Sequence, residues 1–289
     1  MKNMIIYFPQ IKPILISIGF ICIYWYGITY IIGLIISIWY GKKYIKTIKN
    51  NKWNNQDIET LIYNSFIGAV IGGRLGYCFF YHNTHVLQNT LYIFQIWNGG
   101  MSFHGGLIGI IISIFVSSKK IKKNFFEISD VLSVIAPISL GIGRIGNFIN
   151  EELWGKVTTY APISILFKKS KLEDLIFIFE NQKYQVLFIK YHNLPRHPSQ
   201  IYAMILEGII LFLIMNKYQK KYYLKGFISS MFIINYSLLR FLNELFREPD
   251  IQIGLFWNVF SMGQIFSIIM CITGIINIII LKNNYKNLN

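Results

Sequence analysis

Long apolar segments, separated by short polar ones, dominate the pattern along the chain. A membrane-spanning helix needs about 20 consecutive and mostly apolar residues. Seven segments approach or exceed that length, at residues 14–40, 58–81, 91–118, 125–148, 200–216, 224–246 and 256–281. The pattern therefore predicts an all-α polytopic membrane protein with about seven transmembrane helices.

Two parts of the chain depart from this simple pattern. The third segment is interrupted by Asn98, Gly99 and Gly100, and non-helical backbone is tolerated at membrane depth only where protein or a wet cavity surrounds it. We therefore expect this segment to be broken or re-entrant. Residues 149–198 mix charged, aromatic and β-branched residues, which predicts a small folded cap outside the membrane. We see no internal repeat, so we expect residues 1–289 to form one membrane domain that carries this insert.

The composition excludes an ordinary soluble domain and indicates how the chain crosses the membrane. Charged residues make up 14% of the chain, against about 25% in soluble domains, and the mean hydropathy is +0.44. The net charge of +15 comes largely from lysines after the first, third and fifth segments and in the C-terminal tail. The positive-inside rule places these parts in the cytoplasm and the N-terminus outside. The cap has seven basic residues but is too long to follow this rule, and we expect it outside as well. Such basic loops fit an anionic lipid surface, and we expect no nucleic-acid partner.

Charged side chains inside membrane segments are costly and usually functional, and here they fall into a few motifs. These motifs are 72–77 with Arg74, 99–106 with His104, 143–155 with Arg144, Asn147 and Glu152, 196–200 followed by Glu207, and the sixth segment with Arg240, Glu244 and Arg247. The expected orientation puts all of them in the outer half of the membrane or at its outer surface. Arginines at lipid depth that face the protein interior indicate a phosphate-binding site.

Helical spacing indicates which of these side chains share a face. Arg144 and Asn147 are three residues apart, and Arg240 and Glu244 are four apart, so each pair lies on one side of its helix. His104 is the only histidine in an apolar segment, and a neutral imidazole there could take a proton from a nucleophile. No second histidine or cysteine lies at metal-ligand spacing, so we expect no metal and no cofactor.

Each motif taken alone also has a structural interpretation. Arg74 could pair with a backbone carbonyl or with an acid such as Glu207. The stripe that starts at Arg240 could be an ion network that stabilises the helix, and Ser199 could simply be the N-cap of the fifth helix. The glycine pairs of motif 99–106 could be packing notches.

Two other functional classes were weighed against a phosphate-handling enzyme. A small transporter would show broken helices and midplane charges, but usually also an inverted repeat. An intramembrane phospholipase or protease would need a nucleophile beside its base. Ser102 is only two residues from His104, and side chains with that spacing do not face each other on a helix.

The five motifs, in their order along the chain, resemble those of the prolipoprotein diacylglyceryl transferases. Segment 143–155 resembles the family signature, and the other matching blocks are 72–77, 99–106, 196–202 and 240–250, within a match from about 25 to 264. The resemblance implies transfer of the diacylglyceryl group of phosphatidylglycerol to the thiol of a lipobox cysteine in a preprolipoprotein signal peptide. A thioether forms and glycerol phosphate leaves. It also implies a bacterial cytoplasmic (inner) membrane location with the active site toward the periplasm, and we expect a monomer.

The resemblance also implies roles for individual residues. Arg144 matches the arginine that holds the phosphatidylglycerol head group, His104 matches a histidine proposed as general base, and Arg240 matches an essential arginine. The remaining matches, expected to bind or orient substrate, are Tyr26, Asn147, Glu152, Gly155 and Glu244.

Two features depart from the family pattern. Glu151 replaces a residue that is usually small, and its carboxylate would weaken anion binding unless it points away from the phosphate. Residues 163–191 match no block, so we expect the cap to be divergent.

Overall fold

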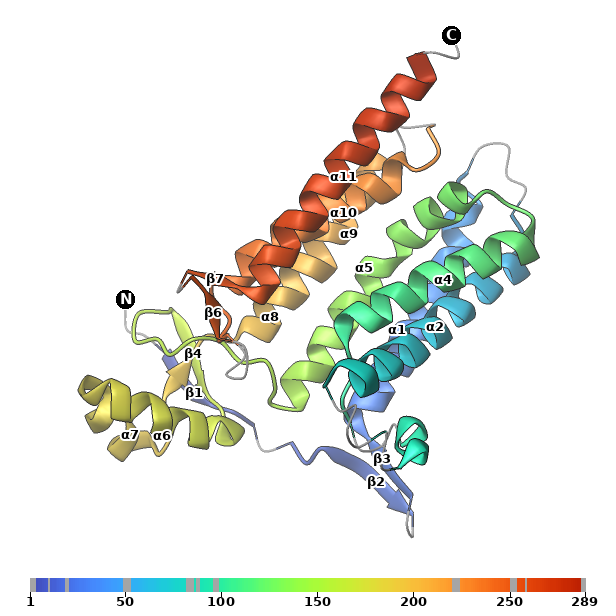
Figure 1. Ribbon diagram of the computed structural model, residues 1–289. Coiled ribbons are helices and arrows are strands. Elements are labelled where there is room, and N and C mark those ends of the chain that lie inside the picture. Colours follow the sequence, from blue (N-terminus) through green and yellow to red (C-terminus); the bar gives the residue numbers. More distant parts are fainter. Residues whose placement is uncertain are drawn as a thin grey trace. The chain divides into compact units, whose positions relative to one another are not determined.

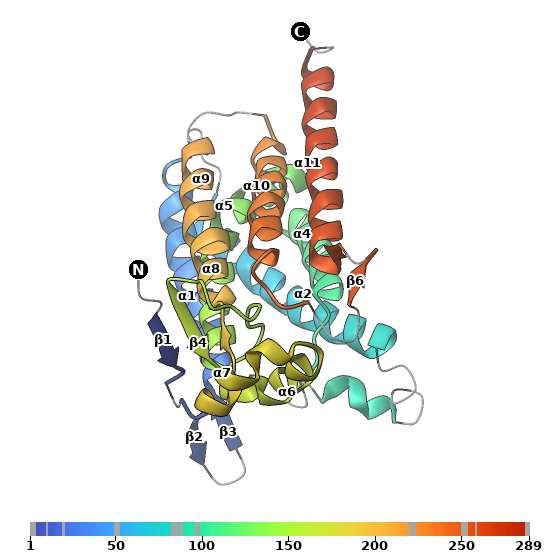
Figure 2. The same cartoon turned by 90° about the vertical axis from the view of Figure 1, so that its left-hand side faces the viewer.

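The computed structural model describes residues 4–9, 11–18, 21–48, 53–81, 86, 89–95, 99–219, 224–249, 254–257 and 259–286. Helices make up most of this part of the chain (Figures 1 and 2). The chain divides into two compact units, whose boundaries fall inside helices. The first unit comprises Met1–Gly33, Ala136–Tyr222 and Ser230–Asn289, and the second comprises Leu34–Ile135 and Tyr223–Ser229.

The second unit is built around two closely packed helices, α2 (Asn55–Tyr81) and α4 (Phe103–Ile121). Glycines line their contact: the Cα of Gly105 and the side chain of Ser102 occupy the space where a Cβ on Gly76 would lie. Small residues let two helix backbones approach in this way. The predicted packing role of the glycine pair at the start of α4 is therefore confirmed for Gly105.

The first unit contains most of the C-terminal helices. The fifth predicted apolar segment of the chain lies in this unit. It is a continuous run of α8 (Ser199–Ala203), the π-helix η5 (Met204–Ile210) and α9 (Leu211–Tyr218). Then follow α10 (Phe227–Glu244), which starts in the second unit, and α11 (Met262–Lys286). Ser199 is the first residue of α8 and Pro198 is the N-cap, so the predicted N-cap at Ser199 is wrong by one position.

Helices α1 (Trp25–Ile45) and α5 (Phe125–Ile149) each contribute to both units. Four helical stretches of the described chain are long and apolar enough to cross a membrane: His104–Ile121, Phe125–Ile149, Ser199–Tyr218 and Met262–Tyr285. The protein is thus a mostly helical membrane protein, and the total of seven spans stays a prediction.

The insert between α5 and α8 folds together with the N-terminus. Strand β4 (Ile163–Leu166) lies between β1 (Met4–Tyr7), which is parallel to it, and β5 (Pro195–Arg196), which is antiparallel. The connection between β4 and β5 consists of η3 (Lys168–Ser170), α6 (Lys171–Glu180), η4 (Gln182–Tyr184) and α7 (Gln185–Tyr191).

A small aromatic core joins this insert to the end of α5. Phe8, Ile165 and Phe167 are buried, and Phe148 and Trp154 pack against them. The ring centroids of Phe8 and Phe148 are 5.1 Å apart in an edge-to-face arrangement, which aromatic pairs favour. The end of α5 is therefore held against the folded insert.

The prediction of an all-helical first segment over 14–40 is wrong at its N-terminal part. Residues Ile14–Ile18 and Ile21–Tyr24 form an antiparallel hairpin, β2 and β3, and α1 begins only at Trp25. Isoleucine recurs there at every second position. This period, combined with β-branching, favours a strand over a helix.

The seventh segment also starts later than predicted. Short strands β6 (Leu255–Phe256) and β7 (Phe260–Ser261) precede α11. A capping box fixes the start of the helix. The backbone N–H of Gln264 donates to Oγ of Ser261 at 3.2 Å, and the backbone N–H of Ser261 donates to Oε1 of Gln264 at 3.0 Å. This Ser-x-x-Gln pattern marks a helix N-terminus.

The predicted break in the third segment is confirmed. The segment begins as a 3-10 helix, η1 (Thr90–Phe94), and α4 begins only at Phe103. Gly99 and Gly100 adopt φ angles of +74° and +80°, a conformation that glycine adopts readily.

Candidate functional site

The centre of the charged cluster in the first unit is Glu207, which binds two arginines. Nε and Nη2 of Arg144 donate to Oε2 of Glu207 at 3.0 and 2.7 Å. Nη1 of Arg240 lies 3.5 Å from Oε1. The Glu207 side chain is fully buried, whereas both arginines keep some exposure. One carboxylate thus holds two guanidinium groups that remain partly accessible.

Local backbone features bring Glu207 to Arg144. Glu207 lies in the π-helix η5, a rare helix type that is frequent at functional sites. Next to it, a Cβ on Gly208 would lie only 2.7 Å from the Cα of Gly141. Gly141 is one turn before Arg144 on α5. The two glycines therefore let α5 and η5 approach closely enough for a direct contact between Arg144 and Glu207.

Charged residues at the end of α10 and just beyond it extend the same network. Arg247 lies three residues after the helix ends at Glu244, so the predicted stripe on one helix is wrong for Arg247. Nη2 of Arg240 lies 2.8 Å from Oε2 of Glu244, and Nη1 of Arg247 lies 3.9 Å from the same atom. Oγ of Ser261 donates to Oε1 of Glu244 at 3.1 Å. A Cβ on Gly263 would lie 2.7 Å from that oxygen. Glu244 is thus enclosed by the start of α11.

The network consists of Arg144, Arg240, Arg247, Glu207 and Glu244. Its three guanidinium groups and two carboxylates leave it with one excess positive charge. Buried ion pairs stabilise a fold only when their geometry is good, and losing one partner is costly. A guanidinium offers five N–H donors, and Glu207 uses two from Arg144. The arrangement is therefore suited to binding one further anion such as a phosphate.

The predicted signature residues form a second hydrogen-bonded group. Nδ2 of Asn147 donates to Oε1 of Glu152 at 2.7 Å, and the Tyr26 hydroxyl interacts with the Asn147 side chain. The Tyr26 hydroxyl is also 2.8 Å from that of Tyr30. The structure thus brings Tyr26, Asn147 and Glu152 together, and their roles toward substrate stay a prediction.

The turn that carries Glu152 is held firmly in a strained conformation. Glu151 and Leu153 have φ angles of +49° and +58°, which cost energy for residues other than glycine and tend to occur at functional sites. Nε2 of Gln200 donates to the Glu152 carbonyl, and Oγ of Ser199 donates to the Leu153 carbonyl, each at 2.7 Å. The start of α8 therefore fixes this turn.

Glu151 points into the insert. Its Oε2 accepts hydrogen bonds from the amides of Lys168 at 2.7 Å and Lys169 at 3.3 Å. The expected conflict between this extra carboxylate and an anion site is thereby avoided, because the charge is taken up by two backbone N–H groups of η3.

Gly155 lies where three chain segments meet. Its amide donates to the His197 carbonyl at 3.0 Å, and its carbonyl accepts from Nη1 of Arg196 at 3.1 Å. A Cβ would lie 2.5 Å from the His197 carbonyl oxygen and 2.7 Å from that of Phe246. Only glycine fits this space, which gives the predicted site residue Gly155 a steric explanation.

Arg196 is the most enclosed cation of this region. Nη2 of Arg196 lies 2.7 Å from Oδ1 of Asp174 on α6, and its Nη1 lies 2.9 Å from Oε2 of Glu248 after α10. Next to it, the pKa of His197 is lowered, chiefly by burial and then by the charge of Lys156. Arg196 therefore ties the insert, Gly155 and the end of α10 to one another.

The second unit contains Arg74 and His104. Arg74 donates to the carbonyls of Tyr92 at 2.7 Å, Ile93 at 3.1 Å and Gly99 at 2.6 Å. The alternative that Arg74 pairs with backbone carbonyls is thus confirmed. Arg74 holds the broken part of the third segment, just ahead of α4, on which His104 is the second residue.

The comparisons with known proteins decide the family. A family model described as prolipoprotein diacylglyceryl transferase matches residues 13–280. The chain belongs to this family. The phosphatidylglycerol--prolipoprotein diacylglyceryl transferase of Wigglesworthia glossinidia brevipalpis is 48% identical over 279 residues, which cover 96% of this chain and 99% of the relative. The proteins of the same name from Pectobacterium carotovorum subsp. carotovorum (strain PC1) and Yersinia enterocolitica are each 43% identical, over 93% and 96% of both chains.

Glu207 is the most informative residue that the sequence analysis did not include in the candidate site of this diacylglyceryl transferase family member. Its signal was an acid within an apolar segment, but that signal does not name its partners. Arg196 was likewise quoted only as part of a motif. Within the described residues, no three His, Cys, Asp or Glu side chains gather as a metal site would require.

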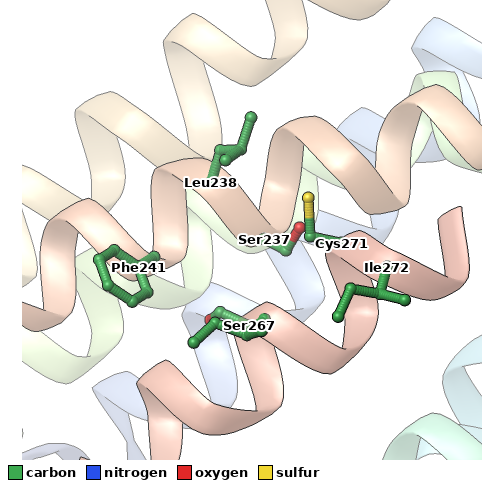
Figure 3. Close-up of a pocket in the computed structure, with 7 residues that line it drawn as sticks. Ser237, Leu238, Phe241, Ser267, Cys271 and Ile272 are labelled. Atoms are coloured by element: carbon green, nitrogen blue, oxygen red, sulfur yellow. The ribbon is translucent and has the colours of Figure 1, made fainter. Parts of the chain in front are cut away.

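An apolar groove of about 320 Å³ lies between α10 and α11 of this diacylglyceryl transferase family member (Figure 3). Its lining residues are Ser237, Leu238, Phe241, Ser267, Ile268, Cys271 and Ile272. Both serine hydroxyls donate to carbonyls of their own helices, at 2.8 Å for Ser237 and 2.7 Å for Ser267. The groove surface is consequently apolar, as suits two helices within a lipid environment.

Proposed function

We propose that the two arginines that share Glu207 hold the phosphate of phosphatidylglycerol. The chain is a transferase that moves the diacylglyceryl group of this lipid to prolipoprotein, in lipoprotein maturation. The observation that carries the site proposal is the contact of Arg144 and Arg240 with one buried carboxylate. Two positive charges fixed in a membrane-embedded network are suited to a lipid phosphate, and such preorganised charges also stabilise a leaving group in the transition state.

The reaction forms one bond and breaks one bond. The thiolate of the lipobox cysteine attacks the carbon of the diacylglyceryl group that carries the phosphate oxygen. A carbon–sulfur bond forms while the carbon–oxygen bond breaks, and the electron pair leaves with the oxygen as glycerol phosphate. Arg144 and Arg240 stabilise the charge that develops on this oxygen. No electron donor, nucleotide or metal ion enters the balance.

His104 acts as the general base that removes the proton from the cysteine thiol. A thiol with a pKa of about 8.5 is mostly protonated at neutral pH, so a base is needed to generate the nucleophile. Tyr26, Asn147 and Glu152 form a hydrogen-bonded group that orients the lipid head group. Gly155 keeps the signature turn in place, and Glu244 keeps Arg240 extended toward Glu207.

The topology completes the proposal. The chain crosses the cytoplasmic membrane with seven spans, as a single membrane domain over 1–289 and as a monomer. Its N-terminus and the cap at 149–198 lie on the periplasmic side, and its C-terminus lies in the cytoplasm. The lysine-rich linkers support this orientation, and the folded insert between α5 and α8 supports a cap.

The test is a reconstitution with purified full-length protein, phosphatidylglycerol and a lipobox peptide. Mass spectrometry should detect a peptide that has gained one diacylglyceryl group on its cysteine, and an equal amount of glycerol phosphate should be released. A peptide with serine in place of that cysteine is the matched control and should stay unmodified. Lipid consumption without peptide would instead indicate a phospholipase, and unaltered lipid and peptide with folded protein would contradict a transferase.

A further inference from the structure

Helix α6 of the cap exposes apolar side chains along one side. The exposed fractions of Leu172, Ile176 and Phe179 are 76%, 56% and 85%. Their spacing of four and three residues places them on one helical face. Asp174, on the opposite face, is fully buried in its pair with Arg196. Helix α6 is therefore amphipathic, with its polar anchor inward and its apolar face outward.

Helix α7 extends this apolar surface. Val186 and Ile189 are strongly exposed and three residues apart, so they share a face as well. Both helices lie together in the same cap (Figures 1 and 2). We call Leu172, Ile176, Phe179, Val186 and Ile189 the cap apolar face. Single exposed apolar residues are ordinary, but several on two neighbouring helices indicate an interaction surface.

Lysines outnumber acids, five to three, along the connection between β4 and β5. Five lysines of the connection between β4 and β5 are exposed, namely Lys168, Lys169, Lys171, Lys183 and Lys190. An apolar helix face flanked by lysines is typical of segments that lie in the plane of an anionic membrane surface. The lysine ammonium groups then meet lipid phosphates while the apolar side chains enter the headgroup boundary.

Hydrogen bonds hold α6 close to the ends of two membrane-spanning helices. Glu151, two residues after the end of α5, accepts from the backbone at the start of η3. Arg196, three residues before α8, pairs with Asp174 in the middle of α6. A helix that crosses a membrane ends near its surface. These two short tethers therefore keep α6 at the level of the lipid headgroups.

We propose that the cap apolar face rests on an anionic lipid surface and inserts its apolar side chains into the headgroup boundary. The occupant of this surface is lipid, selected by apolar contact and by lysine charge. The proposal depends on the membrane location of the chain and not on the transfer reaction, so the two can fail separately.

The experiment measures the surroundings of a spin label at position 179 in the full-length protein. The background carries Cys22→Ala, Cys78→Ala and Cys271→Ala, and Phe179→Cys provides the labelling position. The protein is reconstituted in vesicles of phosphatidylcholine with phosphatidylglycerol, and collision rates with oxygen and with a water-soluble nickel chelate are compared. Lys171→Cys is the matched control, because Lys171 is exposed on the same helix and its position is turned about 100° away from that of Leu172.

The proposal expects the label at position 179 to collide more with oxygen than with the chelate, and the label at position 171 to show the reverse. Replacing the five exposed lysines with glutamine should lower the ratio of oxygen to chelate collisions at position 179. Collision rates typical of water at both positions would overturn the proposal. Shielding that appears only with lipobox peptide would assign the surface to a peptide, and spin–spin broadening would assign it to a second copy; either result overturns lipid contact.

Discussion

Arg144 donates from both Nε and Nη2 to a single oxygen of Glu207, at 3.0 and 2.7 Å. The second oxygen of the same carboxylate faces Arg240. Because Glu207 is fully buried, its charge has no competing contact with bulk water. The position of each guanidinium therefore depends on one residue, Glu207, which the sequence analysis noted as a charged residue but did not place in the site.

Replacing Glu207 by glutamine tests this dependence. The substitution keeps the size of the side chain but removes the charge that holds both arginines. Loss of one preorganised electrostatic contact typically costs about 10²-fold in kcat, and Glu207→Gln would loosen both arginines. We expect Glu207→Gln to lower the rate of thioether formation by about that factor. Glu180→Gln, at an exposed position, is the control, and equal rates for both variants would show that Glu207 does not position the arginines.

His104→Gln separates the base from the lipid site. General bases contribute about 10²- to 10⁴-fold in rate, so we expect a loss in kcat of that order with an unchanged KM for phosphatidylglycerol. Raising the pH toward the thiol pKa of about 8.5 supplies thiolate without a base and should recover part of the loss. A variant with normal turnover at neutral pH would remove His104 from this role.

Asp174→Asn tests the ion pair that anchors the cap. Arg196 would keep its charge in a buried place without its main partner, at a cost of about 3 kcal/mol. We expect a lower Tm in detergent, measured beside Glu180→Gln on the same helix. If the Tm values of the two variants match, the contact between Asp174 and Arg196 does not hold the cap.

The lowered pKa of His197 predicts a loss of stability in mild acid. Burial, and then the charge of Lys156, favour the neutral imidazole in the folded protein. In the unfolded chain the pKa returns to about 6.5. The stabilising contribution is thus present above pH 6.5 or so and is lost as the pH falls through the lowered value. We expect the Tm to fall as the pH drops below about 6.5, and to fall less in His197→Gln. Parallel curves would assign the acid sensitivity to other groups.

The sequence pattern predicted the long helices and the break in the third segment. Apolar segments located the helices, and the glycines at 99 and 100 located the break before α4. The hairpin at Ile14–Tyr24 was missed because a run of apolar residues fits a helix and a strand alike unless its period is examined. The alternation of isoleucine carried that information.

The site was predictable in its residue types and less so in its pairings. Spacing on α10 placed Arg240 beside Glu244, because neighbours along one helix follow from geometry. The contacts of Glu207 with Arg144 and of Arg196 with Asp174 join residues that are 63 and 22 positions apart in the chain. Such pairs depend on how helices pack, which a single sequence does not specify.

The most direct test of the phosphate site is the rate of thioether formation at increasing mole fractions of phosphatidylglycerol in nanodiscs, for the wild type and Arg144→Lys. A lysine ammonium keeps the charge but cannot reproduce the two-pronged geometry of a guanidinium. The account predicts that Arg144→Lys needs a far higher mole fraction of phosphatidylglycerol for saturation than the wild type. Its maximal rate should be at least about tenfold lower, equivalent to about 1.4 kcal/mol. Superimposable curves for the two proteins would contradict it.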